Sequence, residues 1–260
     1  MKVLFIGDIV GSIGRDMVED YLYKIKKDND IDFVIANGEN ISHGKGMLEK
    51  HYDFLKQQGV DCITMGNHTY DKKQILDYIN DHEDIIVPFN RPKVLPGVSS
   101  SLFKVNGVSI RVTSLLGSVY MDNRNSNPFD EIDDYLNKEC DIHIIDAHCE
   151  ATSEKICLAY YAKDKASALL GTHTHVQTAD ERVIDGKIAF ISDVGMTGSY
   201  LSSLGSDLDC TIKRMQGYVQ PLEMATTSGQ FAGVVMEFDD CNYQPLSIHR
   251  ILINDDNPYK

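Results

Sequence analysis

The sequence predicts an α/β fold in which two mixed β-sheets pack face to face and helices flank both. Short apolar strands alternate with helical segments over the first third of the 260-residue chain, which is typical of a mostly parallel sheet with right-handed crossovers. Two dipeptides that favour tight hairpins, Asn106-Gly107 and Asp185-Gly186, each separate two apolar runs. Residues 231–253 have the pattern of an antiparallel pair of strands.

The first third of the chain contains three predicted strand–helix units. The helices are expected from apolar residues that recur at helical spacing, such as Val18, Leu22 and Ile25 in the first one. Asp71 is expected to be the N-cap of the third helix. The expected strands are Lys2–Ile6, 33–36 and 62–65, and the expected helices are 14–27, 48–57 and 71–79.

The rest of the chain is richer in predicted strands. A glycine- and serine-rich stretch at 195–230 contains one helical piece, 207–215, and is a candidate cover for a ligand site. No stretch has the composition of a linker, so residues 1–260 are expected to form a single domain. The expected strands are 101–105, Val108–Leu116, 141–146, Arg182–Ile184, 187–191, 231–238 and 243–253.

Composition and charge narrow the classes of function. The formal net charge is -14, which disfavours binding to the phosphate backbone of a long nucleic acid. A small anionic substrate would need a local positive charge, which bound metal ions supply. The six cysteines form no C-x-x-C pair, and no apolar stretch approaches the ~20 residues of a membrane span. The expected location is therefore the cytoplasm.

Metal-capable side chains follow five of the predicted strands. Ligands in α/β sheets bind beyond the carboxyl ends of strands, and glycine precedes most of these side chains, which leaves room beside an ion. Taken singly, each residue has a simpler interpretation as a turn, a cap or a hydrogen-bonded core histidine. On an extended segment, however, His173 and His175 would emerge on the same face. The candidate ligands are Asp8, Glu39, Asn40, Asn67, His148, His173 and His175.

These oxygen and nitrogen ligands suit iron, manganese, zinc or related ions. Because no cysteine is among them, they argue against a structural zinc site bound by thiolates. Seven ligands exceed the four of one structural zinc site, and they suffice for two ions with Glu39 as the bridging group. Two ions ~3.5–4 Å apart form the clamp used in phosphoryl displacement. The set favours iron or manganese, while zinc or magnesium stays compatible, and two divalent or trivalent ions per chain are expected.

The order of the motifs resembles that of the calcineurin-like metallophosphoesterases. It is most similar to their YmdB-type branch, which comprises bacterial enzymes that act on cyclic nucleotides, and the resemblance extends from residue 2 to about residue 250. Val10 stands where the superfamily usually has a histidine, and Glu39 replaces the usual bridging aspartate, but both match the branch. The matching motifs are Gly7-Asp8, Gly38-Glu39-Asn40, Gly66-Asn67-His68, Asp146-Ala147-His148, Gly171-Thr172-His173-Thr174-His175 and Asp193-Val194-Gly195-Met196-Thr197-Gly198.

The resemblance implies a four-layer α/β/β/α metallophosphoesterase fold and a division of the ligands. One ion would be held by Asp8, Glu39, Asn40 and His175, and the other by Glu39, Asn67, His148 and His173. His68 would face the substrate, where it would either protonate the leaving oxygen or stabilise charge on the phosphoryl group.

The resemblance therefore predicts a two-metal phosphodiesterase for 2′,3′-cyclic or 3′,5′-cyclic nucleotides. Two alternatives stay open at this point. The chain could be a phosphomonoesterase, or a metal-stabilised regulatory module whose partner is a protein of RNA metabolism. The acidic surface favours such a protein over RNA itself. A homo-oligomer is also compatible with the sequence.

Overall fold

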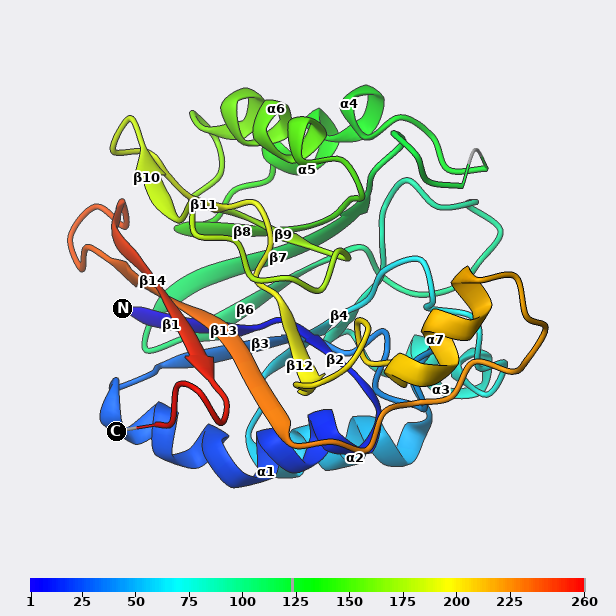
Figure 1. The fold of residues 1–260 in the computed structure, drawn as a ribbon. Coiled ribbons are helices and arrows are strands. Elements are labelled where there is room, and N and C mark those ends of the chain that lie inside the picture. The colour runs from blue at the N-terminus through cyan, green and yellow to red at the C-terminus, as the bar shows by residue number, and fades with distance from the viewer. Residues whose placement is uncertain (123, 260) are drawn as a thin grey trace.

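The computed structural model describes residues 1–122 and 124–259. Two β-sheets lie face to face at the centre of the molecule, and helices cover the outer face of each sheet (Figure 1). An apolar cluster fills the space between the sheets, with Phe5 and Ile35 from one sheet and Ile110 and Ile144 from the other. The predicted α/β class with two mixed, packed sheets and flanking helices is therefore confirmed.

Eight strands within the described ranges form the first sheet. Their bounds are β1 Lys2–Ile6, β2 Asp8–Ile9, β3 Phe33–Asn37, β4 Cys62–Thr64, β5 Ile85–Ile86, β12 Met196–Ser199, β13 Gly229–Phe238 and β14 Pro245–Ile253. The order is β2-β12-β13-β1-β3-β4-β5, with β14 paired to β13. Strands β1, β3, β4 and β5 are parallel, whereas β13 is antiparallel to both β1 and β14. The antiparallel pair expected near the end of the sequence is thus confirmed.

Six strands of the described chain form the second sheet, in the order β10-β11-β9-β8-β7-β6. Their bounds are β6 Ser100–Val105, β7 Val108–Leu116, β8 Ile142–His148, β9 Ala168–Thr172, β10 Arg182–Ile184 and β11 Ile188–Ile191. The two predicted hairpins are confirmed. Asn106 and Gly107 have φ values of 51° and 87°, and Asp185 and Gly186 have 52° and 69°, as a type I′ turn requires.

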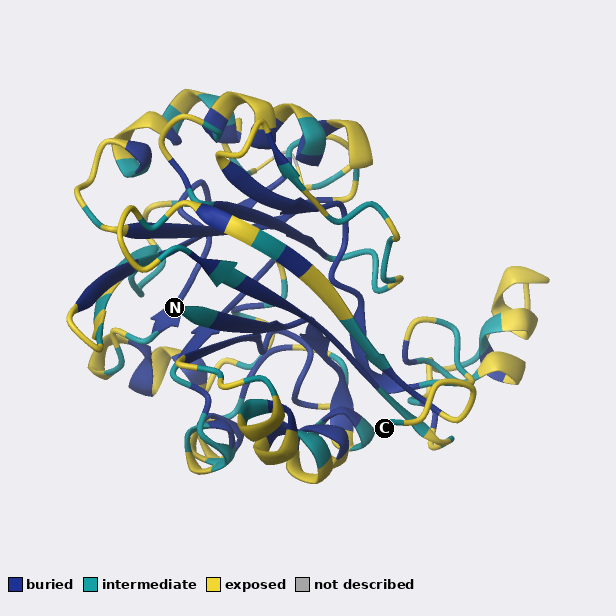
Figure 2. Cartoon of the chain, turned by 90° about the vertical axis from the view of Figure 1, so that its left-hand side faces the viewer, coloured by how far each residue is buried: buried dark blue, intermediate teal, exposed yellow. Residues whose placement is uncertain are grey.

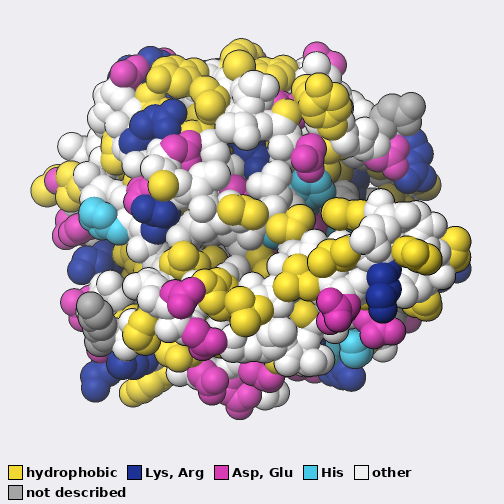
Figure 3. Space-filling model, viewed as in Figure 1, with side chains coloured by type: hydrophobic (Ala, Val, Ile, Leu, Met, Phe, Trp, Pro, Cys, Tyr) yellow, Lys and Arg dark blue, Asp and Glu magenta, His cyan; other side chains and the backbone are white. Residues whose placement is uncertain are grey.

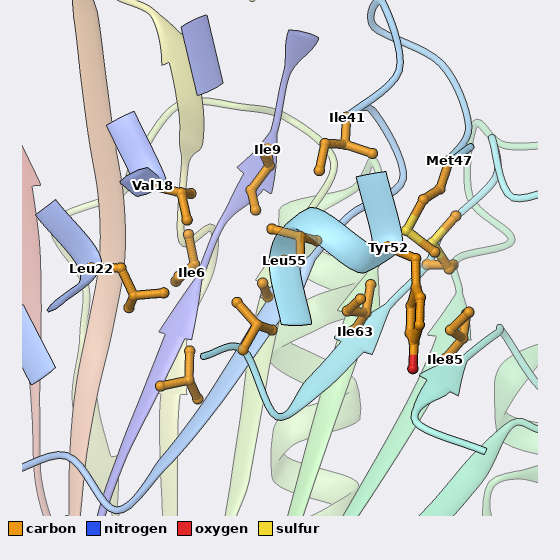
Figure 4. Packing of buried hydrophobic residues seen from close by; sticks show 14 of the residues in the cluster. Ile6, Ile9, Val18, Leu22, Ile41, Met47, Tyr52, Leu55, Ile63 and Ile85 are labelled. Atoms are coloured by element: carbon orange, nitrogen blue, oxygen red, sulfur yellow. The ribbon is translucent and has the colours of Figure 1, made fainter. Parts of the chain in front are cut away.

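The helices other than α7 divide between the two outer faces. Those of the first half pack on the first sheet, as Val18, Leu22 and Leu55 illustrate (Figure 4), and those of the middle pack on the second sheet. In Figure 2 the strands are mostly buried and the outward faces of the helices are exposed. The bounds are α1 Gly11–Asp28, α2 Glu49–Gln58, α3 Ile75–Tyr78 with the 3-10 turn η1 Ile79–Asp81, α4 Pro128–Glu131, α5 Asp133–Leu136, α6 Thr152–Ala162 and α7 Leu208–Met215.

Two details of the third predicted helix are wrong. Helix α3 begins at Ile75 rather than at Asp71, and Asp71 is not its N-cap. The Asp71 carboxylate instead accepts a hydrogen bond from the His68 side chain, because the chain between them forms a turn rather than a helix. None of the helices in the described ranges combines the length and the apolar character needed to cross a bilayer.

Candidate metal centre

The carboxyl ends of the two sheets meet at Asp146, a buried residue of β8. One of its oxygens accepts hydrogen bonds from Asn37 Nδ2 of β3 at 3.0 Å and from Thr64 Oγ1 of β4 at 2.5 Å. The other accepts one from Thr172 Oγ1 of β9 at 2.7 Å. A single carboxylate therefore links strand ends of the first sheet to those of the second, and the loops that follow these strands converge.

The same carboxylate fixes the orientation of His148. Thr172 has one hydroxyl hydrogen, which it donates to Asp146, so its oxygen accepts a hydrogen bond from His148 Nδ1 at 2.8 Å. Nε2, which faces the centre, is therefore the nitrogen with which His148 would bind a metal ion. Partners of this kind, behind a ligating histidine, set the tautomer in known metal sites.

Three further acceptor atoms surround His148 Nε2. Asn67 Oδ1 lies 2.9 Å away, His173 Nδ1 3.0 Å away and Glu39 Oε1 3.1 Å away. One N–H could serve only one of them, so hydrogen bonding cannot satisfy the whole group. Four lone-pair atoms that converge on one point, with two imidazoles, a carboxylate and an amide, form the donor set of a divalent cation.

Gly66 keeps the space beside these atoms open. A β-carbon at this position would lie 2.3 Å from Glu39 Oε2 and 2.5 Å from His148 Nε2, well inside van der Waals contact. Any side chain here would therefore displace the glutamate and the histidine from each other. Glycine is thus required before Asn67 because any side chain there would clash with the atoms of the centre.

Two other predicted ligands, Asp8 and His175, border the same group, since Asp8 Oδ2 accepts a hydrogen bond from the His173 backbone N–H at 3.2 Å. Asp8 and Asn40 are buried, and the Oδ1 atom of each has no hydrogen-bond donor. His175 Nε2 lies 3.9 Å from Asp8 Oδ1, too far for a hydrogen bond but a spacing that two ligands of one ion adopt with bonds of ~2.1 Å. Buried acceptors without a donor are costly, and a second cation would satisfy both.

The expected extended conformation at His173 and His175 is wrong. Their φ values are 94° and 67°, because β9 ends at Thr172 and the chain turns sharply there. Positive φ is strained for residues with a side chain and persists only where the surroundings hold it. The Thr174 backbone N–H and hydroxyl both donate to Asp193 Oδ2, which also forms a fully buried ion pair with Lys155 at 2.9 Å.

Charges within the centre are strongly coupled. Burial alone would raise the pKa of Glu39, but the adjacent His148 outweighs it and lowers that pKa to about 2. Burial likewise disfavours a charged imidazole, yet Glu39 raises the pKa of His148 to about 9. Burial raises the pKa of Asp8 to about 6 against the opposing effects of His175 and His148. Burial, followed by His148, lowers the pKa of His173 to about 3.

His68 lies at the edge of the centre rather than within it. Its backbone N–H donates to Glu39 Oε2 at 3.0 Å, and its Nδ1 lies 2.8 Å from Asp71 Oδ2. The imidazole is half-buried. Asp71 is a functional candidate that the sequence reasoning assigned to helix capping, although its position three residues after His68 was a usable signal.

A pocket of about 220 Å³ opens beside the centre and shares Gly66, Asn67 and Asp71 with it. Its apolar lining includes Tyr70, Pro88, Pro92, Leu95 and Leu116, and its polar lining includes Asp122, Arg124 and Asn125. The Arg91 guanidinium also lines it, hydrogen-bonded to the Tyr70 hydroxyl and to neutral oxygens of the 88–99 loop. No described carboxylate lies within ion-pair distance of Arg91, so its positive charge is not neutralised.

Comparison with known proteins places this geometry in a class. A 5′-nucleotidase precursor from Thermus thermophilus has the same fold over 100% of this chain and 56% of its own, with a TM-score of 0.58 and 10% identity. A novel phosphatase from Mycoplasma pneumoniae aligns over 99% of this chain and 95% of its own, with a TM-score of 0.93 and 36% identity. The fold is that of the calcineurin-like metallophosphoesterases, and the chain is an enzyme of the phosphodiesterase class.

The family follows from the sequence comparisons. The family model described as YmdB-like protein matches residues 4–251. The 2′,3′-cyclic-nucleotide 2′-phosphodiesterase of Bacillus subtilis (strain 168) is 45% identical over 264 residues, which cover 100% of this chain and 99% of that protein. The chain belongs to the YmdB-like family, and the predicted resemblance is confirmed.

Proposed function

We propose that the protein hydrolyses cyclic nucleotides, primarily 2′,3′-cyclic ones, at a two-metal centre. The observation that carries this proposal is the gathering of acceptor atoms that no hydrogen bond can satisfy. His148 Nε2 and three atoms around it form a group of four, and two more acceptors, on Asp8 and Asn40, have no donor. The 2′,3′-cyclic substrate is named after the related Bacillus subtilis enzyme.

The ligands would divide into two sets that share Glu39. Asn67, His148 and His173 would hold one ion with Glu39, and Asp8, Asn40 and His175 would hold the other. When bound, such a pair supplies a water-derived nucleophile at neutral pH and neutralises charge on the phosphoryl oxygens. The oxygen-rich set favours iron or manganese, and both ions would give this acidic protein the positive charge that an anionic substrate needs.

His68 would deliver the proton that the reaction requires. In 2′-phosphodiester hydrolysis a water oxygen forms a new bond to phosphorus, the bond from phosphorus to the 2′-oxygen breaks, and that oxygen takes up a proton. Asp71 accepts from His68 Nδ1, so the opposite nitrogen, Nε2, is the one that donates to the leaving oxygen. The product is a nucleoside 3′-phosphate.

The pocket beside Asn67 would hold the nucleoside. Tyr70 and the surrounding proline and leucine side chains offer an apolar wall, while Arg124 and Asn125 offer polar groups. Small-molecule sites typically combine an apolar wall with a few convergent polar groups. The uncompensated charge of Arg91 adds attraction for a phosphate ester.

A histidine substitution tests this assignment. His68→Ala should lower kcat on 2′,3′-cyclic AMP by about 10²–10⁴-fold while elemental analysis still finds close to the wild-type metal content. His249→Ala, an exposed histidine on β14, is the matched control and should keep full activity. Full activity in the His68 variant would contradict the proton-donor role.

A substrate panel distinguishes the remaining candidates. Purified, metal-loaded enzyme is assayed on 2′,3′-cyclic AMP, 3′,5′-cyclic AMP and 3′-AMP, with products resolved by chromatography. We expect the highest kcat/KM on the 2′,3′-cyclic ester and accumulation of the 3′-monophosphate. Release of inorganic phosphate at a comparable rate would instead identify a phosphomonoesterase.

A further inference from the structure

The segment between β12 and β13 leaves the body of the molecule. We call residues 200–224 the arm; they include helix α7 (Leu208–Met215). In Figure 1 the arm lies at the right, and in the turned view of Figure 2 α7 stands clear of both sheets and of the helices that cover them. Among the helices and strands that the structure describes, none packs extensively on α7.

The arm is nevertheless an ordered unit. Asp207 caps α7 by accepting from the Cys210 backbone N–H at 2.8 Å, and its own N–H donates to Glu223 O at 2.9 Å. The returning chain is tied to the helix by Gln220 Nε2, which donates to Cys210 O at 2.9 Å. At the base, His175 Nδ1 lies 3.2 Å from Leu204 O. The arm is thus preformed, and its base touches a candidate metal ligand.

The surface of the arm is apolar to an unusual degree. Leu208, Ile212 and Met215 follow one another at i, i+4 and i+7 and form a stripe along α7 that faces solvent. Met215 is 81% exposed and Val219 is fully exposed. Apolar side chains also lie over this region in Figure 3. The exposed members are Leu201, Leu204, Leu208, Ile212, Met215, Tyr218, Val219 and Leu222.

The exposed apolar area of the arm is comparable to the area that one partner buries in a protein–protein interface. Large side chains exposed by about half or more leave a total on the order of the ~800 Å² that each partner contributes to a standard interface. Isolated exposed leucines need no explanation, but this many large apolar side chains exposed along one short segment indicate an interaction surface.

The charges of α7 identify the partner. Asp207 and Asp209 lie at its N-terminal end and Lys213 and Arg214 in its last turn, and with Glu223 the whole arm has a net charge of only -1 in a chain of net charge -14. Two copies would repel one another over most of their surface but not here. If two α7 helices cross antiparallel, the acidic end of each faces the basic end of the other, and their dipoles also oppose.

We propose that the arm is a homodimer surface, on which α7 of one protomer packs antiparallel against α7 of a second copy about a two-fold axis. A two-fold interface requires a surface that complements itself, and the apolar stripe flanked by Asp209 and Lys213 does so. Because the base of the arm contacts His175, a dimer would also restrain the loop that carries His175 at the edge of the candidate centre.

Sedimentation equilibrium of the full chain tests this proposal. Wild-type protein should have twice the 29.2 kDa mass of one chain. Ile212→Glu should raise the dissociation constant about 30-fold or more, as for an interface hot spot. Leu246→Glu, an equally exposed apolar residue on β14, is the matched control and should leave the dimer intact. Unchanged circular dichroism melting would show that both variants fold.

A charge-reversal pair tests the antiparallel geometry. Asp209→Lys and Lys213→Glu should each weaken the homodimer, because each places like charges opposite one another. A one-to-one mixture should restore dimers of one chain of each kind. A monomeric wild type at tens of micromolar, or a dimer that Ile212→Glu does not affect, would overturn the proposal. So would a monomer that cosediments with phosphatidylglycerol vesicles, which would make the arm a membrane-binding surface.

Discussion

Strand β8 has a buried histidine at each end, and the two lie in opposite surroundings. His148 at the carboxyl end faces Glu39, with Asp8 and Asp146 also near, and Glu39 overcomes the effect of burial to raise the pKa of His148 to about 9. His143, near the amino end, has only Thr113 as a side-chain partner, on Nε2. Burial, helped by nearby cationic side chains, lowers the pKa of His143 to about 3.

The different surroundings of His148 and His143 show which feature identifies the functional end of the strand. Both histidines are buried on one strand, so burial does not distinguish them. At His148 several lone pairs converge on one point, whereas His143 Nδ1 faces no partner among the described residues. One proton cannot serve all the acceptors around His148 Nε2, so that group has the character of a cation site, whereas a neutral, isolated imidazole requires only its hydrogen bond.

The strongest test replaces each of the two histidines by glutamine in a separate variant. His148→Gln should lower the affinity for Mn²⁺ about 100-fold or more, since it removes a ligand and not merely a supporting partner, whose loss costs 10–100-fold. His143→Gln, the matched control on the same strand, should bind Mn²⁺ as the wild type does. Isothermal titration calorimetry on chelator-stripped protein measures both. Equal affinities in the two variants would remove the distinction between the ends of β8.

The carboxyl end also depends on Asp146. Asp146→Ala leaves the side-chain donors of Asn37, Thr64 and Thr172 without their acceptor in a buried position. At 1–3 kcal/mol for each unsatisfied group, partly relieved by relaxation, the free energy of unfolding should fall by about 3–5 kcal/mol. Urea denaturation in the presence of a chelator measures this apart from metal binding. Asp20→Ala, exposed on α1, should stay within ~0.5 kcal/mol of the wild type, and a similarly small effect at Asp146 would show that it does not link the sheets.

The fold could be predicted where the signal is local. Alternation, helical spacing and the two hairpin dipeptides identified most strands and the helices of the first third. Helix α6 was not predicted because Glu154 and Lys155 point inwards, which breaks the apolar spacing. Those two charged side chains can be buried because residues distant in the sequence pair with them. Ser118 donates hydrogen bonds to Glu154, and Lys155 forms an ion pair with Asp193. Such pairings are not visible in the local sequence.

The candidate site divides in the same way. Its proposed ligands could be selected from the sequence because each lies at or after the end of a strand, and the side chains of Glu39, Asn67, His148 and His173 lie together in the structure. Their supporting partners could not, since Asp146 acts through residues of three other strands. The turn at His173 and His175 was also missed, because it depends on the anchoring of Thr174 by Asp193. The sequence thus indicated the candidate ligands, and the tertiary structure shows the partners that hold them.

The smallest expected effect concerns pH and the amino end of β8. The pKa of His143 is about 3 in the folded protein against ~6.5 for an unfolded histidine. Between these values the unfolded chain binds a proton that the folded chain does not, so the folded state loses stability as pH falls below about 6.5. The slope for one such group is ~1.4 kcal/mol per pH unit, and above pH 7 the contribution is fully present.

His143→Gln removes this titration and keeps a hydrogen-bond donor for Thr113. The free energy of unfolding should therefore fall less steeply in the variant than in the wild type between pH 6 and pH 4.5. Chelator-stripped protein is compared by urea denaturation, so that the other titrating groups, which both proteins share, cancel in the difference. Parallel curves would mean that His143 is protonated equally in both states, and the contrast between the two ends of β8 would then be one of ligands alone and not of charge.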